Sequence, residues 1–217
     1  MKVKKPYILL LILFWGLNTS AQKKLLKEIE KFSAKMANPD SVLARLQKEN
    51  DLVFGYATYN PAWGIPPHYW LIAKKGNQWK AFEYIVKRYV RVFVDDSGNQ
   101  IQEPLITINT FEIDDGLTDS LFKTFKTQKP WELKRDVLKD QNFPACSHLK
   151  DTKFDPCSIR DANSEGLSIM TKQYINSSSF YAPEYYETEC CPGNSDRQRF
   201  LATIAPIKQL FKTLLQK

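Results

Sequence analysis

The sequence predicts an α+β fold, built around an antiparallel meander of about five to six strands with N-terminal helices and a C-terminal helix. Residues 52–113 form short runs rich in aromatic and β-branched residues, separated by turn signals. Apolar residues before and after this region recur at helical spacing. Consecutive strands with helices at both ends are typical of α+β proteins.

Residues 1–21 have the features of a secretory signal peptide. Lysines precede an apolar run over residues 7–17, and small residues precede an expected cleavage after Ala21. The run is shorter than the roughly 20 residues that a membrane-spanning helix needs. We therefore expect a periplasmic or secreted protein with one mature domain, residues 22–217, and no transmembrane segment after signal removal.

The charge pattern argues against a nucleic-acid partner. The chain carries a formal net charge of +7, but its remaining lysines are scattered among acidic residues, as in "KKLLKEIEKF". Such mixing is typical of solvated helix faces, whereas nucleic-acid binding needs basic residues gathered on one stripe.

Two helices are expected before the strands. Apolar residues at 25, 29, 32 and 36 mark one face of the first helix. Asn38 can cap a second, short helix that begins at Pro39 and ends near Lys48.

The meander is delimited by two hairpin signals, Lys75-Gly76-Asn77 and residues 95–99, and short connections of this kind join antiparallel strands. The expected strands are 52–59, 69–75, 78–86, 89–94 and 105–113.

Two helices, an irregular segment and a last strand are expected after the meander. Residues 117–125 should form a helix capped by Asp115 or Thr118, and Pro130 should begin another. Residues 142–166 have an irregular, Pro- and Asn-punctuated sequence, and 167–175 should form a last strand.

The final helix should begin with a capping box. Ser195 is the expected cap, with Gln198 three residues later, and Pro206 should kink the helix or divide it into two abutting helices.

Four cysteines remain after export: Cys146, Cys157, Cys190 and Cys191. A Cys190–Cys191 ring is disfavoured, because adjacent Cα atoms lie about 3.8 Å apart whereas disulfides need about 4.4–6.8 Å. We expect each of these two to pair with Cys146 or Cys157, in either order, which would tie the irregular region 142–195 together.

The sequence lacks the motifs of common enzyme classes. Its glycines are too far apart for phosphate-binding loops, and it has neither H-E-x-x-H nor G-x-S-x-G. The cysteines, even with His148, match no zinc spacing. We expect no metal and no cofactor, and a non-catalytic protein is favoured over an enzyme.

Two patches are candidate sites. The stretch "YNPAWGIPPHYW" concentrates rings that suit stacking on sugars or apolar peptides, although such rings often complete a core instead. Its candidate residues are Tyr59, Trp63, His68, Tyr69 and Trp70.

The second patch, "FYAPEYYETE", contains Glu184 and Glu187. Two carboxylates can share acid and base roles in glycoside cleavage, whereas a solvated acidic loop is the alternative.

The favoured function is therefore non-catalytic binding of a protein or glycan at the cell envelope. An envelope hydrolase of glycosidase type, using Glu184, Glu187 or His68, is the alternative, and a structural or inhibitory partner protein is a third.

Overall fold

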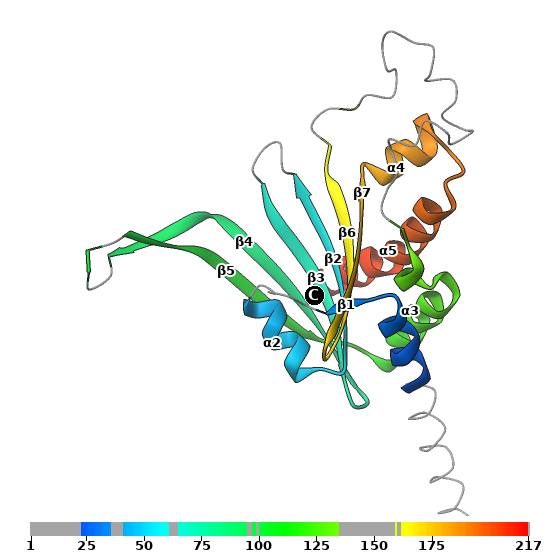
Figure 1. Cartoon of the computed structure of the whole chain (residues 1–217), viewed down its shortest axis with the longest axis horizontal. Helices are drawn as coiled ribbons and strands as arrows, with labels where there is room; N and C mark the ends of the chain where they lie inside the picture. Colours follow the sequence, from blue (N-terminus) through cyan, green and yellow to red (C-terminus); the bar gives the residue numbers. More distant parts are fainter. Residues whose placement is uncertain are drawn as a thin grey trace, which may run out of the picture.

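The computed structural model describes residues 23–35, 41–60, 65–94, 97–98, 100–134, 159 and 162–216. Its centre is a seven-stranded sheet in the order β1-β7-β6-β2-β3-β4-β5, and every neighbouring pair is antiparallel (Figure 1). The predicted α+β class and antiparallel meander are confirmed. The strands are β1 (Ala34–Lys35), β2 (Leu52–Asn60), β3 (Ile65–Lys75), β4 (Gln78–Val94), β5 (Gln100–Glu112), β6 (Ser164–Thr171) and β7 (Tyr174–Tyr181).

The helices surround this sheet. Residues 23–31 are helical, and a 3₁₀ turn, η1 (Pro130–Glu132), follows α3. The π-helical turn η3 (Tyr186–Cys190) follows α4. The remaining helices are α2 (Ser41–Glu49), α3 (Asp115–Gln128), α4 (Pro183–Tyr185) and α5 (Ser195–Leu214).

Two strand assignments from the sequence were wrong. The runs 78–86 and 89–94 belong to one strand, β4, because the polar residues between them form a register shift between Lys87 and Val90. The expected last strand, 167–175, is divided between β6 and β7 at Lys172 and Gln173. The sheet therefore has a four-stranded meander, β2 to β5, to which the β6–β7 hairpin adds along the free side of β2.

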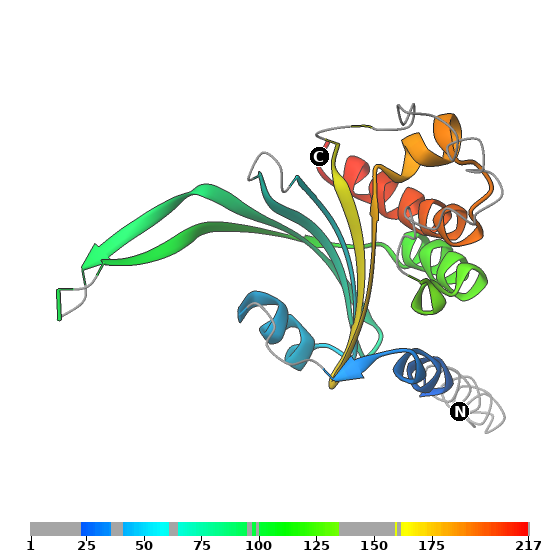
Figure 2. The same cartoon turned by 45° about the horizontal axis from the view of Figure 1, so that its top comes forward.

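Both faces of the sheet are partly covered. The helix 23–31, α3 and α5 lie on one face, here named the α5 face, and α2 lies on the other, named the α2 face (Figure 2). The main core fills the α5 face, where Phe54 packs against Phe125 with ring centroids 4.1 Å apart. Val53 and Leu71 point to the α2 face and pack with Leu46 of α2. Strand alternation thus separates two apolar clusters.

The outer part of the β4–β5 hairpin extends beyond the rest of the sheet. Pairing between β3 and β4 ends at Ile85, whereas pairing between β4 and β5 continues to Val94 and Gln100. Residues 86–94 of β4 and 100–106 of β5 therefore form a two-stranded ribbon, which curves away from the body (Figures 1 and 2). We name this segment the ribbon.

The helix caps differ by one residue from those expected. Asp114 caps α3, and Asn194 caps α5 by accepting from the Arg197 amide at 3.0 Å, so Ser195 is the first helical residue rather than the cap. α5 runs continuously from Ser195 to Leu214 with Pro206 inside it, so the expected alternative of two abutting helices is wrong, whereas a kink at Pro206 stays a prediction.

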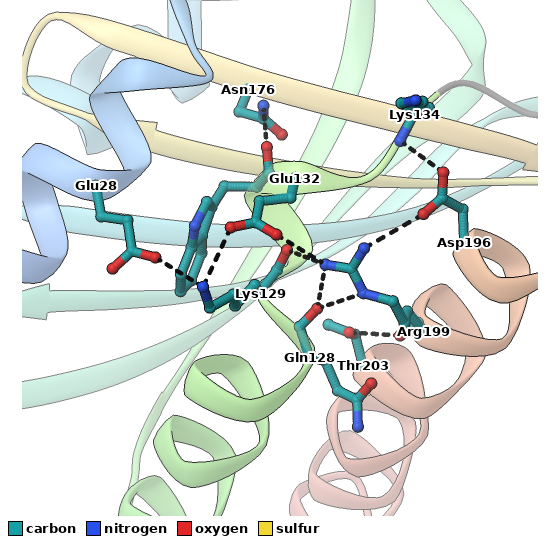
Figure 3. Close-up of polar contacts among 10 residues, drawn as sticks. Glu28, Gln128, Lys129, Glu132, Lys134, Asn176, Asp196, Arg199 and Thr203 are labelled. Carbon is teal, nitrogen blue, oxygen red and sulfur yellow. Dashed lines mark hydrogen bonds and ion pairs between the residues drawn. The ribbon is translucent and has the colours of Figure 1, made fainter.

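A polar network joins α3, η1, α5 and the helix 23–31 (Figure 3). Lys129, in the left-handed conformation with φ 44°, ends α3. Its ammonium lies 3.4 Å from Glu28 and 3.3 Å from Glu132, and Glu132 lies 3.7 Å from Arg199. Three parts of the chain that are far apart in sequence, namely the helix 23–31, residues 115–132 and α5, are thus connected through Lys129 and Glu132.

Cys190 and Cys191 are buried, and neither is a free thiol. Their Sγ atoms lie 3.6 Å apart, well beyond the S–S bond length of about 2.05 Å, so they are not bonded to each other. The expected partners, Cys146 and Cys157, lie outside the described residues, as does most of the irregular segment. The disulfide-tied region 142–195 accordingly stays a prediction.

Within the part of the chain that the structure describes, no helix combines the length and apolar character needed to cross a membrane.

Candidate functional site

The structure divides the predicted aromatic patch between the two sheet faces. Trp63 lies outside the described residues, and Tyr59, half-buried, pairs with Ser164 at the end of β2. Trp70 lies on the α5 face, where it is stacked on Phe211 at 5.4 Å and 9°. Tyr69, next in the chain, contacts the α2-face cluster and stacks on Tyr84 at 5.3 Å. Tyr69 and Trp70 therefore do not form one platform.

His68 belongs to a hydrogen-bonded row across β3, β4 and β5. Its Nε2 lies 3.0 Å from Oε1 of Glu83, and Asn109 donates from Nδ2 to Oε2 of the same carboxylate at 2.8 Å. The Glu83 side chain is only 8% exposed, whereas that of His68 is 35% exposed. A buried carboxylate held by Asn109 thus fixes an imidazole that solvent can reach.

The same imidazole nitrogen also lies 3.1 Å from Nε1 of Trp70, which can only donate. Nε2 can either accept from Trp70 or donate to Glu83, but one nitrogen cannot do both at once. Whether Nε2 of His68 carries a hydrogen therefore decides which of the two neighbours it bonds.

A second row connects β2, β6, α4 and α5. The Tyr56 hydroxyl donates to Oε2 of Glu165 at 2.6 Å, and the Lys208 ammonium lies 3.1 Å from the same oxygen. Lys208 also contacts Oε1 of Glu184 at 3.0 Å. Burial raises the pKa of Tyr56 far above its ordinary value, and the Glu165 carboxylate raises it further.

The pKa of Lys208 reflects two opposing effects. Burial lowers it, but Glu165 and Glu184 together outweigh burial and leave the pKa above its ordinary value. Lys208 is therefore a fixed cation between two carboxylates.

The two rows meet at Trp70. Its ring lies 5.5 Å from that of Tyr56 and 5.5 Å from that of His68. Sequence reasoning found His68, Trp70 and Glu184 but missed Tyr56, Glu83, Glu165 and Lys208. Cross-strand registers, such as Trp70 opposite Glu83, bring in the first three, and the packing of α5 brings in Lys208; no local motif reveals either.

The two predicted acid–base residues have different surroundings. Glu184 is 68% exposed and pairs with Lys208. Glu187 accepts from the Gly193 amide at 2.8 Å and from Nε2 of Gln198 at 2.6 Å, beside buried Arg197. Glu187 thus holds the segment before α5 against the first turn of that helix.

A hollow of about 410 Å³ lies between α4 and α5. Glu184 and Lys208 contribute to its wall, whereas His68 and Trp70 do not. Its lining residues are Glu184, Leu201, Ile204, Ala205, Lys208, Gln209 and Lys212.

Among the described residues, no three or more His, Cys, Asp or Glu side chains are grouped to hold a metal ion. Nε2 of His68 lies within hydrogen-bond distance of Glu83 and Trp70, but His68 bonds no serine, threonine or cysteine of this part of the chain. The His68–Glu83 pair has the composition of an oriented general base, without a hydrogen-bonded nucleophile.

No protein-family model and no curated protein matched the chain in sequence comparisons.

Proposed function

We propose that this protein is an exported, non-catalytic domain that binds a protein partner at the cell envelope, in the periplasm or outside the cell. The observation that carries the proposal is the ribbon of β4 and β5, which leaves the body of the domain.

The ribbon is of low stability unless another protein segment packs against it. Beyond Ile85, β5 is the one strand that pairs with β4 among the described residues, and the pairing with β3 has ended. Two-stranded hairpins are marginally stable in water by themselves, and stability normally comes from a third strand or a packed helix. A partner protein lying against the ribbon would supply that missing layer.

A protein partner fits better than a glycan. Sugar recognition by stacking needs an aromatic ring with an open face. Trp70 is stacked on Phe211, and Tyr69 is stacked on Tyr84, so these rings already stack within the domain.

The test is a variant without the ribbon. Replacing residues 88–104 by Asn-Gly joins Lys87 to Leu105, which already face each other, through a two-residue turn suited to a hairpin. The body should stay folded, and cross-linked capture of the envelope partner from the native host should be lost. An unchanged captured partner, or co-sedimentation of the wild type with purified cell-wall glycan, would contradict the proposal.

The proposed export is tested by a separate measurement. The intact mass of protein from the native host should lack residues 1–21. A mass that retains them would remove the envelope from the proposal.

An envelope hydrolase is the second candidate, and the pairing of His68 with Glu83 favours it. This activity would use His68 as a base, with Glu184 at the end of the neighbouring row. If the wild type releases soluble fragments from cell-wall glycan and the His68→Ala variant does not, the protein is a hydrolase and not a purely binding domain.

A further inference from the structure

The two edges of the sheet are unlike each other. The β1 edge consists of two exposed residues, Ala34 and Lys35. A short edge strand with a lysine is a common way to prevent pairing with another chain. At the other edge, β5 presents 13 residues. Among the strands that the structure describes, one edge is therefore protected, and none pairs with the outer side of the other, here called the open edge.

The open edge has the composition of a pairing strand. Residues 105–111, "LITINTF", contain no charge, and β-branched residues predominate. Ile106 and Ile108 are 38% and 37% exposed, respectively, and they are two of the five exposed large apolar residues in the described part of the chain. β5 contains no lysine, and its one proline, Pro104, lies outside the uncharged stretch 105–111.

We propose that the chain forms a two-fold symmetric dimer in which β5 pairs antiparallel with β5 of a second copy, with the axis at Thr107. The two sheets then form one continuous sheet, and neither open edge remains.

The choice of a second copy rests on self-complementarity. With the axis at Thr107, Ile106 faces Ile108 of the partner subunit, and this apolar pair occurs twice. Thr107 faces Thr107 of the partner subunit, and apolar and Thr–Thr pairs are both favourable across strands. Glu112 faces Gln102 of the partner subunit, so no like charges meet.

The dimer is independent of the proposed function. Its central pairs lie within residues 105–109 at the base of the hairpin, and the ribbon-deleted variant retains them, whereas partner binding uses the ribbon residues 88–94 and 100–104. The ribbon-deleted variant should still dimerise, so failure of one proposal is distinguishable from failure of the other.

A charge pair tests the register. The double variant Ile106→Lys/Ile108→Lys sets ammonium groups opposite each other twice, and Ile106→Lys/Ile108→Glu sets each ammonium opposite a carboxylate. Sedimentation equilibrium over a concentration series should show a dimer for the wild type, a monomer for the first variant and a salt-sensitive dimer for the second. A wild type that stays monomeric, or two variants that behave alike, would overturn the proposal. Thermal unfolding of each variant establishes that the monomer is folded.

A cysteine at the axis tests the geometry directly. Directly opposed residues of antiparallel strands have Cα atoms about 4.5–5.5 Å apart, which is within disulfide range. Thr107→Cys should therefore give a cross-linked dimer under mild oxidation, with a 107–107 peptide in the mass spectrum. Thr110→Cys is the control, because its two copies would lie about 20 Å apart along the strands. Equal cross-linking at both positions, or at neither, would overturn the register.

Discussion

Arg199 of α5 closes the C-terminus of α3 through the carbonyl oxygen of Gln128, which accepts from Nε at 2.9 Å and from Nη2 at 2.7 Å. Nη2 also donates to the carbonyl oxygen of Lys129 at 2.8 Å. The last carbonyl groups of a helix have no partner within it, and here a side chain 70 residues away supplies one.

Arg199→Lys should lower the free energy of unfolding by about 1–3 kcal/mol. A lysine ammonium lacks the planar fork that reaches both carbonyl oxygens, so the end of α3 would lose donors. Urea denaturation measures the change, and Arg45→Lys on the exposed surface of α2 is the control. Equal effects at the two positions would show that the fork contributes nothing to stability.

The cap of α5 provides a second comparison. Asn194→Ala should destabilise the protein by about 0.5–2 kcal/mol, because the Arg197 amide loses the side-chain acceptor. Ser195→Ala should change the denaturation midpoint much less, since Ser195 already lies inside the helix. A larger loss at Ser195 than at Asn194 would mean that the helix begins one residue later.

Loss of the buried carboxylate of Glu83 should destabilise the protein more than loss of an exposed carboxylate nearby. Glu83→Gln places an amide between His68 and Asn109 and removes one acceptor, at a cost of about 1–3 kcal/mol. Glu112→Gln, at a side chain 76% exposed and paired with Lys80, should cost less than about 1 kcal/mol. Chemical denaturation of both variants decides the comparison, and equal costs would contradict it.

The lowered pKa of Asp51 predicts that the stability of the protein depends on pH. The hydrogen bond from the Gly76 amide lowers the pKa of Asp51. Burial raises this pKa in part, and Lys172 lowers it further. Because the pKa is lowered in the folded state, this stabilisation is fully present above the ordinary value of 3.8 and is lost as pH falls through the folded pKa.

The Asp51→Asn variant should therefore lose stability at neutral pH, by no more than about 1 kcal/mol since Lys172 is exposed. Its difference from the wild type should shrink on acidification below 3.8. Unfolding measured across this pH range is the test, with Asp119→Asn in α3 as the control. A difference that does not depend on pH would contradict the linkage.

The cysteine pairing remains open to direct measurement. Peptide mapping without reductant should place Cys190 and Cys191 in disulfides with different cysteines, one each with Cys146 and Cys157. A ring between the neighbours, or free thiols, would contradict this expectation.

The local sequence predicted an element well where a single residue type determines the backbone conformation. Gly76 adopts φ 59° between β3 and β4, and the sequence placed a turn there. No glycine or proline marks the turn at Lys172 and Gln173, so the β6–β7 hairpin was missed. Asn194 and Ser195 are both good caps, and only the structure distinguishes them.

The site was harder to predict than the fold. The local sequence pointed to His68 and Trp70, but their partners come from other strands. Glu83 faces Trp70 through the β3–β4 register, and Glu165 faces Thr58 through the β2–β6 register. Register depends on the whole sheet, and β6 reaches β2 from more than a hundred residues away.

The position of β2 also governs the order in which the chain can fold. β3 follows it after a short connection, so one side of β2 can be paired early. The other side has to wait for β6, because Leu52 pairs with Thr171. Contacts of such long separation form slowly, since the intervening chain must first lose its freedom. The N-terminal part of the chain is synthesised first, so β2, the central strand of the finished sheet, is at first an edge strand. It stays exposed to pairing with other chains until β6 has been synthesised.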